Sequence, residues 1–134
     1  MTTSLDRLVV DASAVMACCL GEVGYEKLET LLTSNVQLVM SAPTRLELGI
    51  VSLHKNIQIR VDQSIQIYQI QIELFTPAHA TLAIAAFTQY GKGRHPAALN
   101  FGDCCAYALA KSLNLPLLYK GNDFAQTDIA SALA

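Results

Sequence analysis

Four acidic residues stand where short apolar runs end or where helices are expected to begin. Asp11 directly follows Leu-Val-Val, and Asp123 follows the run Leu-Pro-Leu-Leu-Tyr. Glu47 falls in the first turns of the helix expected after the second apolar run, and Asp103 opens a later helix. In a parallel α/β sheet these positions share one rim, so we expect the four carboxylates to converge there. Close carboxylates repel one another without a cation, and oxygen ligands favour Mg²⁺, with Mn²⁺ possible.

Each acid also has a purely structural interpretation, as a cap of a helix N-terminus. The pairings to consider are Asp11 with Ser13, Glu47 with Thr44, Asp103 with Asn100, and Asp123 with a final helix. For Glu47, Asp103 and Asp123 taken singly, capping is the stronger interpretation. Asp11 differs, because a charge directly after a buried strand usually has a task. The four together favour a site, and a zinc site is not expected because the sequence has no His–Cys cluster.

The elements that must position these acids follow from the apolar periodicity. We expect strands at residues 8–10, 36–40, 72–75 and 115–119 and helices at 12–20, 25–32, 41–55, 77–90 and 103–113, followed by a final helix in the tail. Residues 57–74 fit both an alternating strand pattern and a helical stripe, and we interpret the first part as a helix. The alternation of strands and helices predicts a doubly wound α/β sheet.

Composition limits the class of protein. The 134 residues fit one domain spanning 1–134, and 52% are apolar. Charged residues are only 15%, which indicates either apolar surface covered by a partner or a well-buried parallel sheet. No membrane span or signal peptide is expected. The four cysteines form two adjacent pairs without C-x-x-C spacing, so we expect reduced thiols in a cytoplasmic protein.

Four segments resemble motifs of one known family. Leu-Val-Val-Asp11-Ala-Ser13-Ala is similar to the opening motif of PIN domains, and Ser41-Ala-Pro-Thr-Arg-Leu-Glu47-Leu resembles their second acidic motif. Residues 91–107, containing Arg94-His-Pro-Ala-Ala-Leu-Asn-Phe-Gly-Asp103, resemble a segment typical of VapC-type toxins, which residues 117–128 continue. The third and fourth segments are the specific ones.

The resemblance implies a PIN-like three-layer fold with a central, mostly parallel sheet flanked by helices. It implies a metal-dependent endoribonuclease that acts on single-stranded RNA as the toxin of a VapBC-type toxin–antitoxin pair. The family's metal ligands map onto Asp11 and Asp103, with Glu47 and Asp123 in support, and these four would be the catalytic residues. The implied partners are an RNA substrate, a cognate antitoxin and a second copy in a homodimer, with DNA reached only through the antitoxin.

Binding of RNA would need local groups, because the net charge of −2 provides no general positive field. Lys92 and Arg94, in the loop before Asp103, could contact the RNA backbone, and Ser13 could bind a phosphate or water. For Lys92 a solvated loop residue is an equal alternative, and for Ser13 capping is the stronger one.

One position departs from the family pattern. Many PIN domains carry an acid two residues before Asp123, where this chain has Gly121. This leaves open whether one or two metal ions bind. Together with the low charge content, it supports an alternative in which the chain is a catalytically weak PIN-like binding module. RNA cleavage that stops on adding a chelator would separate the two hypotheses.

Overall fold

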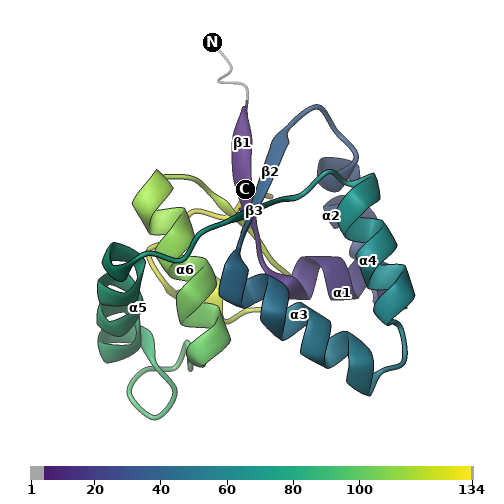
Figure 1. The fold of residues 1–134 in the computed structure, drawn as a ribbon. Coiled ribbons are helices and arrows are strands. Elements are labelled where there is room, and N and C mark those ends of the chain that lie inside the picture. The colour runs from purple at the N-terminus through teal and green to yellow at the C-terminus, as the bar shows by residue number, and fades with distance from the viewer. Residues whose placement is uncertain (1–4, 134) are drawn as a thin grey trace.

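The computed structural model describes residues 5–133, which form a four-stranded parallel sheet with helices on both faces (Figure 1). In chain order the elements are β1 (Arg7–Val10), α1 (Ala12–Leu20), α2 (Tyr25–Leu32), β2 (Gln37–Ser41), α3 (Ala42–His54), α4 (Gln58–Ile67), β3 (Gln71–Glu73), α5 (Pro77–Tyr90), α6 (Phe101–Leu113), β4 (Leu117–Leu118) and the 3₁₀ turn η1 (Phe124–Gln126). The strand order is β3-β2-β1-β4, and every neighbouring pair is parallel. The expected α/β fold with a central parallel sheet is confirmed.

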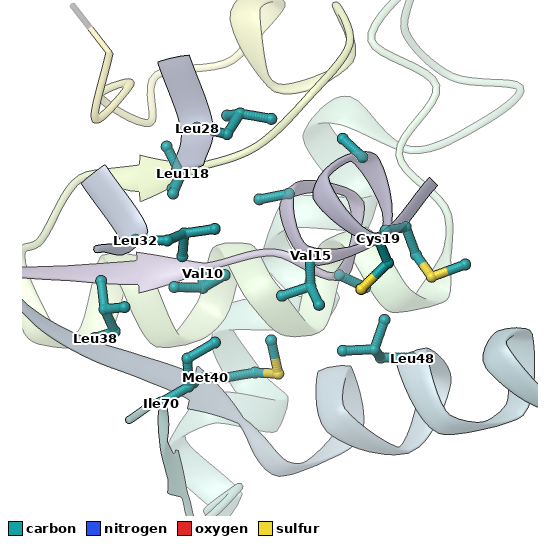
Figure 2. Close-up of a cluster of buried hydrophobic side chains, with 14 of the residues drawn as sticks. Val10, Val15, Cys19, Leu28, Leu32, Leu38, Met40, Leu48, Ile70 and Leu118 are labelled. Atoms are coloured by element: carbon teal, nitrogen blue, oxygen red, sulfur yellow. The ribbon is translucent and has the colours of Figure 1, made fainter. Parts of the chain in front are cut away.

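The sheet is apolar on both faces because helices cover both. Leu8, Val10, Leu38, Met40 and Leu118 point into a first core. This core is completed by side chains of α1 to α4, several of which Figure 2 draws around the sheet.

The alternate positions of the same strands face the other way. Val9, Val39 and Leu117 enter a second core formed with α5 and α6. Successive residues of β1, β2 and β4 therefore serve two cores, which explains why these strands contain continuous apolar runs that do not alternate with polar residues.

The ambiguous segment 57–74 contains a helix followed by a strand, as expected. Val61 of α4 is fully buried in the first core, and Ile65 and Tyr68 pack against it, so the helical stripe is the pattern that the fold uses. The strand β3 covers Gln71–Glu73, slightly earlier than the expected 72–75.

The prediction of a final helix is wrong for the described residues, because the tail contains only η1, a single 3₁₀ turn of three residues. The segment after it runs beside β4, where the Leu117 amide donates to Ala130 and the Ala132 amide donates to Leu117. The tail satisfies the open edge of a two-residue strand, and this pairing takes the backbone groups that a helix would need.

Candidate active site

Asp11 sits at the carboxyl end of β1 and caps α1. Its Oδ2 accepts hydrogen bonds from the Ser13 amide at 3.1 Å and from the Ser13 hydroxyl at 2.6 Å. The side chain is buried, and burial raises the pKa of Asp11 despite these bonds, with a further contribution from the charge of Asp123. The capping interpretation is therefore correct in geometry, and it leaves a carboxylate that is costly to ionise at the rim.

Glu47 projects from the second turn of α3 towards the first turn of α6. Its carboxylate lies against the Cα of Gly102, where a Cβ would be only 2.7 Å from Oε1. Burial raises the pKa of Glu47 to about 7, and the charges of Asp11 and Asp103 add to the shift. The alternative capping box with Thr44 is wrong, because Thr44 lies inside α3 and its buried hydroxyl has no partner within residues 5–133.

Asp103 is the third residue of α6, which begins two residues earlier than expected. It forms a capping box with Asn100, since its Oδ2 accepts from the Asn100 amide at 3.0 Å while its own amide donates to Asn100 Oδ1 at 2.8 Å. Burial raises the pKa of Asp103 to about 6; the Asn100 amide opposes the shift, and the charges of Asp11 and Asp123 add to it. Asp103 is thus both a cap and a member of the acidic rim.

Asp123 is exposed in the loop after β4. It stands at the N-cap position of η1 but makes no side-chain capping bond there, so the capping role expected for it is absent. Its charge acts on Asp11 and Asp103, which places it at the same rim. Four acids from four separate segments thus share one edge of the sheet, at the carboxyl ends of the strands.

The chemistry of this donor set fits a hard divalent cation, because carboxylate oxygens are the ligands that Mg²⁺ and Mn²⁺ prefer. The side chains as placed are not gathered into a ligand shell: within residues 5–133, no group of three or more His, Cys, Asp or Glu side chains is arranged to hold a metal ion. Asp11 and Asp103 are each engaged with a helix cap instead.

Of the other expected site residues, Ser13 contacts a rim acid directly. The Ser13 hydroxyl donates to Asp11 and accepts from the Lys120 amide at 3.0 Å, so it links the end of β1 to the loop after β4. Lys92 and Arg94 are exposed in the loop between α5 and α6, which Figure 1 places at the lower edge with the start of α6. Gly121 has a φ of 104°, a conformation in which an acidic side chain would be strained.

Two features were missed by the sequence reasoning. Gly102 received no role, although a glycine inside the first turn of a helix beside Asp103 was the available signal. Asp128, which also received no role, accepts hydrogen bonds from the Tyr107 hydroxyl at 2.6 Å and from Lys111 at 2.7 Å, which attach the tail to α6.

A family model for the PIN domain matches residues 8–130. The chain belongs to the PIN-domain family. This PIN domain is 39% identical over 129 residues to "Ribonuclease VapC42" of Mycobacterium tuberculosis, covering 93% of this chain and 98% of that protein. It is 41% identical over 126 residues to "Ribonuclease VapC36" of the same species, covering 91% of each chain.

Two solved structures share the fold of this PIN domain. One is the crystal structure of M. tuberculosis VapC20, described as a sarcin-ricin loop cleaving toxin, with a TM-score of 0.74, 14% identity and coverage of 93% of this chain and 98% of that one. The other is a toxin–antitoxin complex from Klebsiella pneumoniae, with a TM-score of 0.69, 16% identity and coverage of 95% and 98%. No helix within residues 5–133 is both long and apolar enough to cross a membrane.

Proposed function

We propose that this PIN domain is a Mg²⁺-dependent endoribonuclease that hydrolyses RNA phosphodiesters as the toxin of a VapBC-type toxin–antitoxin pair. The observation that carries the proposal is the rim, where Asp11, Glu47 and Asp103 come from three different elements at the carboxyl ends of the strands. Burial raises the pKa of all three, and the charge of Asp11 raises the pKa of Glu47 and Asp103 further. Relatives at about 40% identity that carry the name ribonuclease support the same activity.

The residues of the rim suit distinct tasks. Asp11 and Asp103 would hold the ion, and their hydrogen bonds to Ser13 and Asn100 fix the direction of each carboxylate. The bound ion would screen the charge of the phosphodiester and lower the pKa of a water molecule. Glu47, whose pKa is about 7 in the metal-free protein, is suited to position that water or to accept its proton near neutral pH. The exposed Asp123 would complete the ion's environment.

Substrate binding is assigned to the loop before α6. The exposed side chains of Lys92 and Arg94 are available to phosphate oxygens, while Ser13 would act mainly by holding Asp11. Since RNA is the substrate in this proposal, the site of action is the cytoplasm.

A cognate antitoxin and a second copy of the chain are the proposed protein partners, and DNA would be reached only through the antitoxin. The antitoxin is proposed from structural neighbours such as the Klebsiella toxin–antitoxin complex and VapBC2 of Rickettsia felis, which was crystallised with promoter DNA. The homodimer is proposed from the surface. Leu46, Ile50 and Leu53 form an exposed ridge on α3, and α5 and α6 border a groove whose lining includes no charged residue.

Incubation of the purified protein with a mixed RNA pool, with Mg²⁺ and with excess chelator, tests the activity. We expect discrete cut ends with Mg²⁺ that disappear with the chelator and in the variant Asp11→Ala. The matched control is Glu26→Gln, an exposed acid on α2, which should cut like the wild type. Intact RNA under all conditions, together with retained antitoxin binding, would favour the alternative of a catalytically weak binding module.

A further inference from the structure

We propose that Gly102 is a positioning residue of this site: because it has no side chain, the Glu47 carboxylate can cross from α3 and lie against the first turn of α6 beside Asp103. The inference rests on the proposed function, since it explains how one of the four acids reaches the rim. Gly102 carries no functional group of its own, so its role would be to position Glu47.

The space at Gly102 is occupied by one side chain. A Cβ on Gly102 would lie 2.5 Å from Cδ of Glu47 and 2.7 Å from its Oε1, and it would overlap Oε2 more closely still. Real Cβ atoms essentially never approach another heavy atom within 3.0 Å. Glu47 therefore keeps its present position only while residue 102 is glycine.

The backbone does not require glycine here. Gly102 is a buried residue inside α6, and its φ lies outside the left-handed region that favours glycine. Alanine is the better helix former, so local propensity alone would favour alanine. Glycine is instead explained by the close packing of α3 against α6, which places the Glu47 carboxylate where a Cβ of residue 102 would lie.

The three atoms nearest to the missing Cβ all belong to the end of the Glu47 side chain. A methyl group would consequently displace a flexible carboxylate and leave the backbone where it is. Gly91 is the contrasting case, because a Cβ there would meet the backbone carbonyl oxygen and the ring of Phe87. Substitution of Gly91 should disturb the fold, whereas substitution of Gly102 should disturb the acidic rim.

The test compares Gly102→Ala, Glu47→Ala and the double variant with wild type. The control is Gly49→Ala, a helical glycine of α3 whose Cβ would approach only the Arg45 guanidinium, at 3.3 Å. Three quantities are measured: cleavage of a mixed RNA pool with Mg²⁺, the melting temperature without metal, and the rise of that temperature on adding Mg²⁺.

We expect Gly102→Ala to lower kcat ~10-fold or more, up to the ~10²–10⁴-fold that loss of a catalytic acid or base costs. The Mg²⁺-induced rise of the melting temperature of this variant should also shrink. Its metal-free melting temperature should equal or exceed that of wild type. In the Glu47→Ala background the same substitution should change kcat less than about twofold, because both changes remove the same carboxylate from the rim. Gly49→Ala should behave as wild type.

Several results would overturn the inference. The first is a Gly102→Ala variant that cleaves RNA and responds to Mg²⁺ as Gly49→Ala does. The second is an effect on kcat that multiplies with that of Glu47→Ala. If the melting temperature of Gly102→Ala is lower than that of wild type, the double variant must restore it, because Glu47 supplies the atoms that clash with the new methyl group. A double variant that does not restore the melting temperature rejects the proposal. If Glu47→Ala cleaves RNA normally, Glu47 is not part of the active site, and both its proposed role and the inference are rejected. If Glu47→Ala is inactive while Gly102→Ala is normal, only the inference is rejected.

Discussion

At the scale of single residues, the acids at the rim serve the fold and the proposed chemistry together. Asp11 and Asp103 accept hydrogen bonds that begin α1 and α6, which orients each carboxylate before any ligand arrives. Burial is the largest cause of the raised pKa values of Asp11, Glu47 and Asp103, and mutual repulsion is the smaller one. The cost of ionising these groups in the metal-free protein thus comes first from lost hydration.

The variant Asp103→Asn should abolish RNA cleavage and stabilise the metal-free fold. Asparagine retains an acceptor for the Asn100 amide, so the capping box survives while one buried charge is removed. We expect the melting temperature in chelator to rise on the order of a few °C, and the further rise with Mg²⁺ to shrink. A variant that melts no higher than wild type, responds equally to Mg²⁺ and still cuts RNA would make Asp103 a structural acid only.

The raised pKa of Glu47 predicts a pH dependence of the metal-free protein. The ordinary value of 4.5 rises to about 7 in the fold, so the folded state binds the proton more tightly than the unfolded chain. The contribution of Glu47 to the free energy of unfolding should therefore be fully present below pH 4.5 and be lost as the pH climbs to about 7. Urea titrations in chelator across this range measure the slope.

Glu47→Gln is the control for this slope, because glutamine cannot ionise and the neighbouring acids Asp11 and Asp103 remain. The difference between wild type and variant isolates Glu47 from every other titrating group. Equal slopes in the two proteins would show that the Glu47 carboxyl is as easily ionised in the fold as in the unfolded chain.

The sequence supports the prediction that the four acids share one rim, because the ends of parallel strands share one edge whatever the details of packing. The sequence does not predict the position of the Glu47 carboxylate, which depends on how closely α3 approaches α6 at Gly102. Sequence spacing predicts the capping box of Asn100 and Asp103, since that contact is local. A contact between residues 47 and 102 has no such local signal.

At the scale of elements, the prediction succeeded where burial decides the structure. Strands enclosed by two cores, such as β1 and β2, must be apolar runs, and the helix in the first part of residues 57–74 was predicted because Val61 packs into the first core. The tail failed because its backbone pairs with Leu117 at the sheet edge, a long-range bond that the local pattern does not contain. The glycine at position 121, where many PIN domains carry an acid, is explained by the backbone, because a φ of 104° is readily adopted only by glycine.

The loop between α5 and α6 is the element to which substrate binding is assigned. Arg94→Ala should weaken RNA cleavage mainly by raising KM, and the loss should be largest at low salt, where a phosphate contact contributes most. The control Lys27→Ala removes an exposed positive charge from α2, which Figure 1 draws away from the lower edge of the molecule. An unchanged KM at low salt would remove Arg94 from the RNA path.

At the scale of the whole molecule, the low charge content accompanies both a buried sheet and exposed apolar side chains. The sheet is buried on two faces, and the surface still exposes large apolar side chains on α3, α5 and the start of α6. Ile84 is 69% exposed and Phe101 is 81% exposed, and both line the groove between α5 and α6. In the proposed homodimer, the ridge on α3 and the apolar groove would be the two halves of a self-complementary interface.

The variant Ile84→Asp should therefore convert the proposed homodimer into a monomer with little loss of fold stability. An aspartate in the groove would lose its hydration on dimerisation without gaining a partner, because no charged residue lines the groove. Light scattering over a wide concentration range measures the mass, and Ile59→Asp on α4, at an equally exposed position of 70%, is the matched control. A monomeric wild type would reject self-association. A variant that stays dimeric but no longer binds its antitoxin would assign the groove to the antitoxin, and the interface between copies would then lie elsewhere on the molecule.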